Sequence, residues 1–253
     1  MKWDARRYDE KYNFVYKYGE ALVTMLNPKP DERILDIGCG TGYLTSRIAE
    51  KCRNVTGIDL SETMIATAKK NYPDINFIVA DATVFRDEKG FDGIFSNATL
   101  HWISDQEGLN NNLYALLKKG GRLIVEFGGK DNVAVILNTL REVLASFGYQ
   151  RQANQYPWYY PSVGQYAAAL EKAGFRVLKA EHYDRPTPLA DEKDSLENWI
   201  DMFGTYFFEG VSEIYKMNIL AEVSGRLKPR CFVNGRWIAD YKRIRVHALK
   251  KQL

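Results

Sequence analysis

The sequence predicts an α/β fold in which helices cover both faces of a mostly parallel sheet. A short apolar run at 34–37 passes through three glycines directly into a helical pattern at 43–49. Strand-like runs follow at 54–59, 76–81, 91–97 and 122–127, separated by helical patterns. This alternation is typical of parallel strands joined by crossover helices. Several of the runs end in a polar residue, so one edge of the sheet should gather ligand-binding side chains.

Length and composition fit one domain with a cap or insertion. The chain of 253 residues can bury a sizeable core, and its formal charge of +3 gives no case for a nucleic-acid partner. Three widely spaced cysteines form neither a disulfide framework nor a paired metal site, so we expect no metal. The first residues are unlike a signal peptide, and no apolar run approaches the roughly 20 residues that span a bilayer. We therefore expect a cytoplasmic monomer or homodimer without a membrane partner.

The glycine turn after the first strand indicates a nucleotide-type ligand. Gly38, Gly40 and Gly42 let the backbone turn tightly and approach a ligand closely. Their Gly-x-Gly-x-Gly spacing differs from the Gly-x-Gly-x-x-Gly of dinucleotide enzymes. Asp36 would repel a pyrophosphate but suits a ligand that brings a cation, as the sulfonium and α-amino group of S-adenosylmethionine do. The alternative is a tight strand-helix turn that binds nothing.

The next three strands end in polar groups at the same edge. Asp59 ends the second strand, where its two oxygens can accept ribose hydroxyls, and Ser61 begins the following helix. Asp81 and Ala82 end the third strand, where a side-chain acceptor and a backbone N–H can meet an adenine edge. The fourth strand delivers Asn97 and the residues after it, through 102, to this rim. The sequence therefore predicts a nucleoside-binding site at the carboxyl ends of the strands.

Two aromatic segments suggest covers for the site. The stretch from 3 to 26 ends in a helical pattern and carries many rings, including Tyr8 and Tyr12. It is either a packed surface helix or a lid over the cofactor that supplies substrate-facing rings. The segment 156–161, which contains Trp158, is a predicted aromatic cap, or alternatively a set of surface-packed rings.

The rest of the chain continues the α/β pattern. A helix is predicted over 109–117 and ends at Lys118-Lys-Gly-Gly121, because cations in a last turn and glycine after it are favourable. The basic stretch at 226–251 is expected to be mostly a solvated strand face rather than an RNA site. The other predicted elements are helices at 133–147, 162–173, 196–207 and 211–223, and strands at 176–183 and 237–249.

With these motifs in place, the chain resembles the class I S-adenosylmethionine-dependent methyltransferases. The resemblance covers nearly all of the chain and is most specific over 33–129. Within that superfamily the chain is most similar to trans-aconitate 2-methyltransferases and related small-molecule carboxyl methyltransferases, including the malonyl-carrier-protein type. The features behind this choice are Trp3 with the following tyrosines, Asn97-Ala-Thr-Leu-His-Trp102, and the Gly-Gly-x-Leu at the fifth strand.

The resemblance implies a Rossmann-like seven-stranded sheet of order 3-2-1-4-5-7-6, with strand 7 antiparallel. It implies one methyltransferase domain over 1–253, made of an N-terminal helical lid (1–30), a cofactor-binding half (31–130) and a substrate half (131–253). S-adenosylmethionine is the implied cofactor. Its methionine part would lie at the glycine turn and Asn97, and its ribose and adenine at Asp59, Leu60, Asp81 and Ala82. The full predicted cofactor set is Asp36, Gly38, Cys39, Gly40, Gly42, Asp59, Leu60, Met64, Asp81, Ala82, Asn97 and Ala98.

The implied reaction is in-line methyl transfer to a small molecule, most simply to a carboxylate oxygen. Because the cofactor carries the reactivity, the protein mainly aligns and desolvates the reactants. A carboxylate needs no base, whereas a phenol or amine acceptor could use His101, which is otherwise a pocket wall. Arg185 and the arginines of the last strand are candidates to hold a carboxylate. The predicted substrate set is Tyr8, Tyr12, His101, Trp102, Trp158 and Arg185.

Three other functions remain open from the sequence. An NAD-dependent oxidoreductase shares the architecture, but Asp36, the glycine spacing and the lack of a Tyr-x-x-x-Lys pair argue against it. A nucleic-acid methyltransferase would be expected to show Asn/Asp-Pro-Pro-Tyr after the fourth strand, where this chain has Ser96-Asn-Ala-Thr99. The third alternative is a protein that binds S-adenosylmethionine without turning it over. Only an activity measurement distinguishes it from a methyltransferase.

Overall fold

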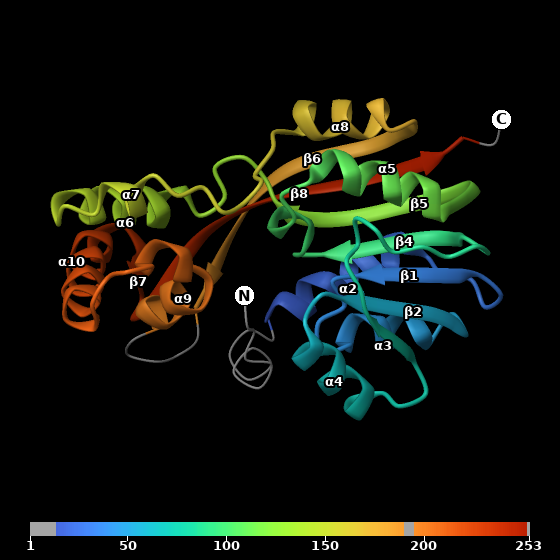
Figure 1. The fold of residues 1–253 in the computed structure, drawn as a ribbon, viewed down its shortest axis with the longest axis horizontal. Helices are drawn as coiled ribbons and strands as arrows, with labels where there is room; N and C mark the ends of the chain where they lie inside the picture. The colour runs from blue at the N-terminus through green and yellow to red at the C-terminus, as the bar shows by residue number, and fades with distance from the viewer. Residues whose placement is uncertain (1–13, 190–194, 252–253) are drawn as a thin grey trace. The chain divides into compact units, whose positions relative to one another are not determined.

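The computed structural model describes residues 14–189 and 195–251, and their contacts divide the chain into two compact units (Figure 1). Of the described residues, the first unit contains 14–129, 161–182 and 244–251. The second unit contains 130–160, 183–189 and 195–243. Two long strands, β6 (Phe175–Pro188) and β8 (Arg236–Lys250), contribute residues to both units. The division into a 1–30 lid and two halves stays a prediction, and residues 1–13 of that lid lie outside the described residues.

The sheet has the strand order β3-β2-β1-β4-β5-β8-β6, and the short β7 (Phe232–Val233) pairs with β8 off this path. The four pairings among the first five strands are parallel, and β8 is antiparallel. The predicted order 3-2-1-4-5-7-6 is confirmed, because β8 is the strand that the sequence presents as the seventh. The bounds of the parallel strands are β1 Arg33–Ile37, β2 Asn54–Asp59, β3 Asn76–Val79, β4 Phe91–Asn97 and β5 Leu117–Gly128.

The register of these strands brings their polar ends to one edge. On either side of β1, Asp36 lies opposite Gly57 of β2 and Phe95 of β4. At the ends of the outer pairs, Asp59 lies opposite Val79, and Asn97 lies opposite Glu126. The carboxyl ends of β1 to β5 therefore align along the rim where the sequence predicts the ligand.

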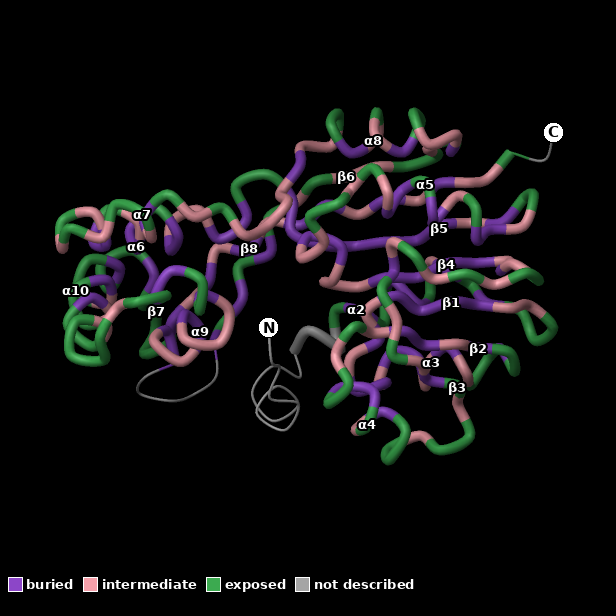
Figure 2. Tube along the Cα trace, in the orientation of Figure 1, coloured by how far each residue is buried: buried purple, intermediate pink, exposed green. Residues whose placement is uncertain are grey.

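Helices pack around this sheet in the first unit and close its core. Helices α2 (Phe14–Leu26) and α3 (Tyr43–Ala49) share a buried cluster with β1, β4 and β5, to which Ile34, Phe95 and Ile124 contribute. Helix α4 (Glu62–Asn71) packs Ile65 and Ala68 against the glycine-turn residue Cys39 and Phe77 of β3. Figure 2 shows the resulting buried track along the central strands.

The prediction for the end of the 109–117 helix was wrong. Helix α5 (Gln106–Leu116) ends earlier, and Lys118 to Gly121 belong to the start of β5, which has a bulge where Leu117 pairs with Phe91. The Lys118 ammonium instead binds Asp92 at 2.7 Å. The cation that meets the end of the helix comes from β8: Lys250 donates to the carbonyls of Tyr114 and Leu117, both at 2.7 Å. This long-range partner explains why local spacing misplaced the lysine.

The second unit is mostly helical. It contains α6 (Ala134–Ser146), α7 (Gln150–Ala153), α9 (Ser195–Phe203), the 3-10 helix η2 (Thr205–Phe208) and α10 (Glu213–Cys231). Helix α10 continues eight residues past its predicted end at Val223 and carries Pro229 inside. The predicted core positions Leu196, Trp199 and Phe207 are buried. Segment 156–161 has no regular secondary structure, and α8 (Val163–Lys172), in the first unit, begins after it with a capping box at Ser162.

The last strand differs from the predicted solvated face. Its apolar residues Ile244, Val246 and Ala248 are fully buried as their alternation predicts, but Arg243 is also buried. The Arg243 guanidinium lies over the ring of the buried Tyr241, 4.6 Å from its centroid, so this part of the face is covered by protein. Across 14–189 and 195–251, no helix is long and apolar enough to cross a membrane. Within the same ranges, no group of His, Cys, Asp and Glu side chains is placed to hold a metal ion.

Candidate active site

The glycine turn is held in shape by its neighbours. The backbone N–H groups of Gly38 and Cys39 both donate to the carbonyl of Ile58, at 2.8 and 3.0 Å. Gly38 has φ of 70°, and a Cβ there would lie 2.1 Å from the Thr99 hydroxyl oxygen. Gly42 is similarly enclosed, because a Cβ there would lie 2.8 Å from the Phe77 ring. These two glycines are needed for packing within the protein.

Gly40 is the glycine that leaves room for a ligand. Its φ is 55°, and a Cβ at this position would meet no atom within 4 Å. Its N–H donates to Asp59 Oδ2 at 3.1 Å, which ties the turn to the end of β2. The turn thus offers an open backbone approach beside a carboxylate, as the predicted cofactor requires.

Asp36 is a buried carboxyl group with one side-chain hydrogen bond that the sequence did not reveal. It is 2 % exposed, and Oδ2 accepts from the Thr45 hydroxyl at 2.7 Å. Burial raises the pKa of Asp36 to about 7, with a smaller contribution from the charge of Asp59, while Thr45 acts in the opposite direction. A nearby cationic group would favour the ionised form. This environment fits a ligand with positive charge.

Asp59 accepts hydrogen bonds from the backbone in addition to its predicted role in binding the ribose. Its Oδ1 accepts from the N–H of Ser61 at 2.8 Å and its Oδ2 accepts from Gly40, while the Ser61 hydroxyl accepts from Met64 at the start of α4. Burial raises the pKa of Asp59, and these backbone donors lower it. Each carboxylate oxygen retains a second acceptor position, so ribose hydroxyls can still bind. Leu60 beside it is 71 % exposed, whereas Met64 is buried.

The cysteine of the turn is not a nucleophile. Burial raises the pKa of the Cys39 thiol, and the negative charges of Asp36 and Asp59 raise it further. Cys39 therefore stays a neutral thiol that packs against α4.

The predicted adenine position follows β3. The N–H of Ala80 donates to the carbonyl of Asp59 at 3.0 Å, so the two strand ends stay together. Asp81 is exposed, and its Oδ1 accepts from the N–H and hydroxyl of Thr83 at 2.8 and 2.7 Å. The carbonyl of Ala82 accepts from the Asn112 side chain at 2.8 Å, a partner on α5 that sequence spacing does not reveal.

The end of β4 is strained and supported from β5. Ala98 has φ of 57°, a conformation that favours glycine, and its N–H donates to the carbonyl of Glu126 at 2.7 Å. The Thr99 hydroxyl reaches the carbonyls of Gly38 at 3.3 Å and Asn97 at 3.2 Å. The β4 end and the glycine turn are therefore in contact through Thr99.

A buried ion pair lies behind this rim. The Glu126 side chain is 1 % exposed, and its Oε2 accepts from Arg245 Nε at 2.7 Å and lies 2.6 Å from Arg245 Nη2. Arg245 also approaches Glu181 of β6 at 3.5 Å. The pair links β5, β8 and β6, and sequence analysis missed it because its members are 119 positions apart.

His101 and Trp102 lie on a 3-10 helix, η1 (Leu100–Trp102), directly after the β4 end. His101 is 6 % exposed and stacks against Phe127, with ring centroids 6.4 Å apart. Its ring centroid is 5.5 Å from that of Trp102. This packing suits a pocket wall more than an exposed base.

The structure does not bring all predicted substrate residues into one unit. Trp158 and Arg185 belong to the second unit, whereas His101 and Trp102 belong to the first. Trp158 stacks with Tyr160 at 5.8 Å between ring centroids, and Arg185 is 7 % exposed on β6. Tyr8 and Tyr12 lie outside the described residues.

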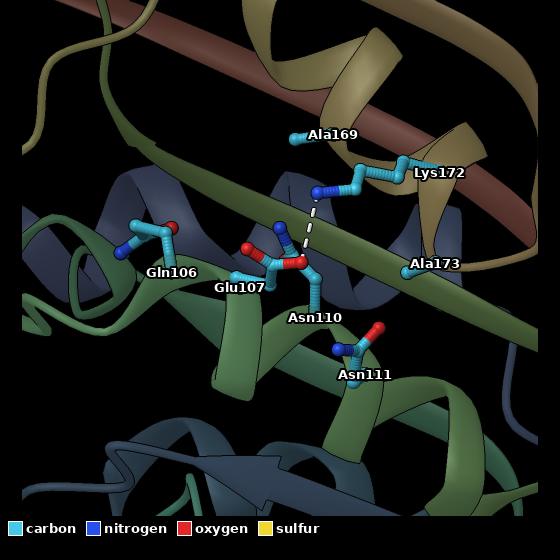
Figure 3. Close-up of a pocket in the computed structure, with 7 residues that line it drawn as sticks. All are labelled: Gln106, Glu107, Asn110, Asn111, Ala169, Lys172 and Ala173. Carbon is cyan, nitrogen blue, oxygen red and sulfur yellow. Dashed lines mark hydrogen bonds and ion pairs between the residues drawn. The ribbon is translucent and has the colours of Figure 1, made fainter.

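A separate hollow of about 200 Å³ lies between α5 and α8 (Figure 3). Its mouth carries the exposed ion pair of Lys172 and Glu107, 2.8 Å apart, with Asn110 and Asn111 below it. It shares no residue with the predicted cofactor set. We assign it no part in the chemistry.

Comparisons with known proteins agree with this geometry. Residues 35–125 match the methyltransferase domain family. Over 260 aligned residues the chain is 32 % identical to an uncharacterised methyltransferase, C70.08c, of Schizosaccharomyces pombe, covering 98 % of each chain. The chain belongs to the class I S-adenosylmethionine-dependent methyltransferases.

Other relatives align with this methyltransferase over only part of its length. It is 43 % identical over 134 residues to malonyl-[acyl-carrier protein] O-methyltransferase 1 of Ilyobacter polytropus, covering 50 % of each chain. It is 33 % identical over 162 residues to trans-aconitate 2-methyltransferase of Methylobacterium radiotolerans, covering 63 % of this chain and 58 % of that one. In fold it resembles an S-adenosylmethionine-dependent methyltransferase of Mesorhizobium loti, with a TM-score of 0.55, 19 % identity and coverage of 91 % and 96 %.

The cofactor of the methyltransferase is accordingly S-adenosylmethionine. This decides against the NAD-dependent oxidoreductase that the architecture alone allowed. The open turn at Gly40 and the acids Asp36 and Asp59 fit the cofactor, and their individual roles stay predictions.

Proposed function

We propose that this methyltransferase transfers the methyl group of S-adenosylmethionine to a carboxylate oxygen of a small polycarboxylic acid. A new C–O bond forms as the C–S bond of the sulfonium breaks, and sulfur keeps the electron pair. The products are a methyl ester and S-adenosylhomocysteine. Since the attacking carboxylate is already ionised at neutral pH, no proton has to move.

The observation that carries this proposal is the similarity to carboxyl methyltransferases, and Arg185 is the predicted residue to hold the acceptor. It is 7 % exposed on β6 in the second unit, and its charge acts on the neighbouring Tyr241 hydroxyl. The planar fork of an arginine matches the geometry of a carboxylate. The names of relatives, which include trans-aconitate and malonyl-carrier-protein methyltransferases, point to the same acceptor chemistry.

The residues of the chain would contribute binding and alignment. Gly40 and Asp59 would hold the cofactor at the carboxyl ends of β1 and β2. His101, packed between Phe127 and Trp102, would shape the pocket wall and is not required as a base. We also expect a cytoplasmic monomer or homodimer with a small-molecule partner and no nucleic-acid substrate.

The test is an acceptor screen that measures release of S-adenosylhomocysteine. We expect turnover with small polycarboxylates such as trans-aconitate, and none with small amines or RNA. The Arg185→Met variant should raise the KM for the carboxylate roughly tenfold or more, because a buried guanidinium partner is lost. Turnover of amines or RNA without any carboxylate turnover would overturn the proposal. An unchanged KM in Arg185→Met would overturn the claim that Arg185 holds the acceptor carboxylate.

A further inference from the structure

Asn112 is a buried polar residue of α5 whose side chain binds a different segment of the chain. It is 4 % exposed. Its Nδ2 group donates to the carbonyl of Ala82 at 2.8 Å and to the carbonyl of Phe85 at 3.0 Å. Its Oδ1 accepts from Arg86 Nη1. All three bonds go to the segment that follows β3, which we call the adenine loop (residues 80–86) because the predicted adenine position lies there.

The partners of this amide fix its orientation. Two backbone carbonyls face the nitrogen, and a guanidinium group faces the oxygen. Exchanging the nitrogen and the oxygen would set the oxygen against two acceptors and the nitrogen against a donor. Asparagine is also a poor helix former, and burying its amide is unfavourable unless the hydrogen bonds are made. The bonds from Asn112 to the adenine loop offset both costs.

The adenine loop is a turn that needs an outside contact. Within it, the carbonyl of Asp81 accepts from the N–H groups of Val84 and Phe85 at 3.2 and 2.9 Å. These bonds shape the turn, whereas the bonds from Asn112 attach it to a helix. The contact uses the carbonyl of Ala82 and not the N–H group that is predicted to meet the adenine edge.

Helix α5 is a rigid base for this contact. Leu109, one turn before Asn112, is fully buried. At the first turn of the helix, Gln106 Nε2 donates to the carbonyls of Leu100 and Ile103 at 2.8 and 2.6 Å, so α5 also holds the η1 segment. The whole arrangement lies within the first unit. A side chain on α5 can therefore set the place of the adenine loop relative to the end of β4.

We propose that Asn112 is a positioning residue that holds the adenine loop so that the Asp81 carboxylate and the Ala82 N–H bind the amino edge of adenine together. Thr83 engages Asp81 Oδ1, which leaves Oδ2 to accept from the exocyclic amino group. The Ala82 N–H donates to the adjacent ring nitrogen. An acceptor and a donor at a fixed spacing admit adenine and oppose hypoxanthine, whose edge carries the reversed pattern.

This inference concerns recognition of the cofactor. It rests on the predicted adenine position at Asp81 and Ala82 and goes beyond the proposed function, because it does not depend on which acceptor is methylated. It can therefore be tested by binding alone.

The test compares the Kd of S-adenosylhomocysteine with that of S-inosylhomocysteine, which carries hypoxanthine in place of adenine. Both are titrated calorimetrically into the full-length protein. We expect wild type to prefer S-adenosylhomocysteine roughly 100-fold or more, because the inosine analogue sets donor against donor and acceptor against acceptor. Asn112→Leu removes all three bonds to the adenine loop. It should raise the Kd of S-adenosylhomocysteine roughly tenfold, leave the weak binding of the analogue nearly unchanged, and so reduce the preference roughly tenfold.

A neighbouring residue of the same helix offers the matched control. Asn111 is exposed, and Asn111→Leu should keep both Kd values and the preference. Asn112→Asp retains the acceptor for Arg86 but loses both donors, so it should show the same loss of preference if Asn112→Leu folds poorly. Hydrogen exchange gives a readout without ligand: the Val84 and Phe85 amides should exchange faster in Asn112→Leu than in Asn111→Leu.

Several results would overturn this role of Asn112. A purely structural role would weaken binding of both ligands in proportion and leave the preference unchanged in Asn112→Leu and Asn112→Asp. Wild-type Kd values in both variants, or equal exchange of the loop amides in the Leu variants of 111 and 112, would show that Asn112 does not hold the loop. Equal binding of the two ligands by wild type would show that the adenine edge is not recognised there.

The two proposals fail in different ways. If the preference falls in Asn112→Leu but no carboxylic acid is methylated, the positioning role stands and the proposed function falls. If a methyl ester forms and the preference is unchanged in Asn112→Leu, the proposed function stands and the role of Asn112 falls.

Discussion

The Gly40→Ala variant separates a ligand contact from a folding requirement. At φ of 55° an alanine costs roughly 1–2 kcal/mol of stability, because its Cβ is crowded in the left-handed region. No other cost arises from the protein, since the new methyl meets no atom within 4 Å. For a chain of this size the expected fall in Tm is roughly 2–8 °C. The fold should therefore survive.

Binding of the cofactor should suffer separately in this variant. The added methyl points into the open approach where we place the ligand, and overpacking a close contact costs about 1–3 kcal/mol. That range is a roughly 5- to 150-fold rise in the Kd of S-adenosylhomocysteine, measured by calorimetric titration.

Gly148→Ala is the matched control. Gly148 lies in the second unit, has φ of 87°, and its Cβ would also meet no atom within 4 Å. It should lose similar stability but keep the wild-type Kd for S-adenosylhomocysteine. Equal Kd values in the two variants would refute the placement of the cofactor at Gly40.

Three further predictions follow from other residues of the site. Because burial raises the pKa of Asp36 from 3.8 to about 7, the folded state holds a proton that the unfolded state releases. The free energy of unfolding of the ligand-free protein should thus fall by about 3 kcal/mol as pH rises from about 4 to 7. Urea titrations across this range should show a weaker fall in Asp36→Asn. Arg245→Met should cost about 3–5 kcal/mol in urea unfolding, because it removes the cation that pairs with the buried Glu126 carboxylate, and adding Glu126→Gln should restore part of it. His101→Phe should lower kcat for the carboxylate acceptor by less than roughly tenfold, since a general base would contribute 100-fold or more.

Each of these three predictions would be contradicted by a specific result. The same pH slope in Asp36→Asn and wild type would mean that Asp36 is ionised throughout. Additive losses in the Glu126 and Arg245 variants would show that the two side chains do not interact. A 100-fold loss of kcat in His101→Phe, with a changed pH profile, would make His101 a base and favour a phenol or amine acceptor.

The first half of the fold was predictable because its signals are local. Strands β2 and β4 have the predicted bounds, since apolar runs there end in Asp59 and Asn97. The glycine turn was likewise readable from spacing alone. The C-terminal half was less predictable from the sequence. Helix α10 continues through polar residues and Pro229, where the apolar periodicity has already stopped. Its length depends on packing against α6, for which the sequence offers no local signal.

The candidate site was also predictable only where its signals are local. Predicted groups such as Asp36, Gly38, Gly40 and Asp59 do come together, because parallel strands end at one edge. Two partners were not predicted: Thr45, which binds Asp36 from nine positions away, and Glu126, which supports the end of β4 from another strand, because neither carries a motif. The burial of Arg243 was also missed. Alternation along β8 suggested a solvated basic face, but the guanidinium packs against the ring of Tyr241, which is itself buried.

The most direct test of the central claim is the chemical position of the transferred methyl group. Wild-type enzyme would be incubated with S-adenosylmethionine labelled in the methyl group and with trans-aconitate, and the product then treated with mild base. The account predicts that all of the label is released as methanol, because an ester hydrolyses. Label that is transferred but stays bound to the product after base would place the methyl group on nitrogen or carbon. That result would contradict carboxylate methylation.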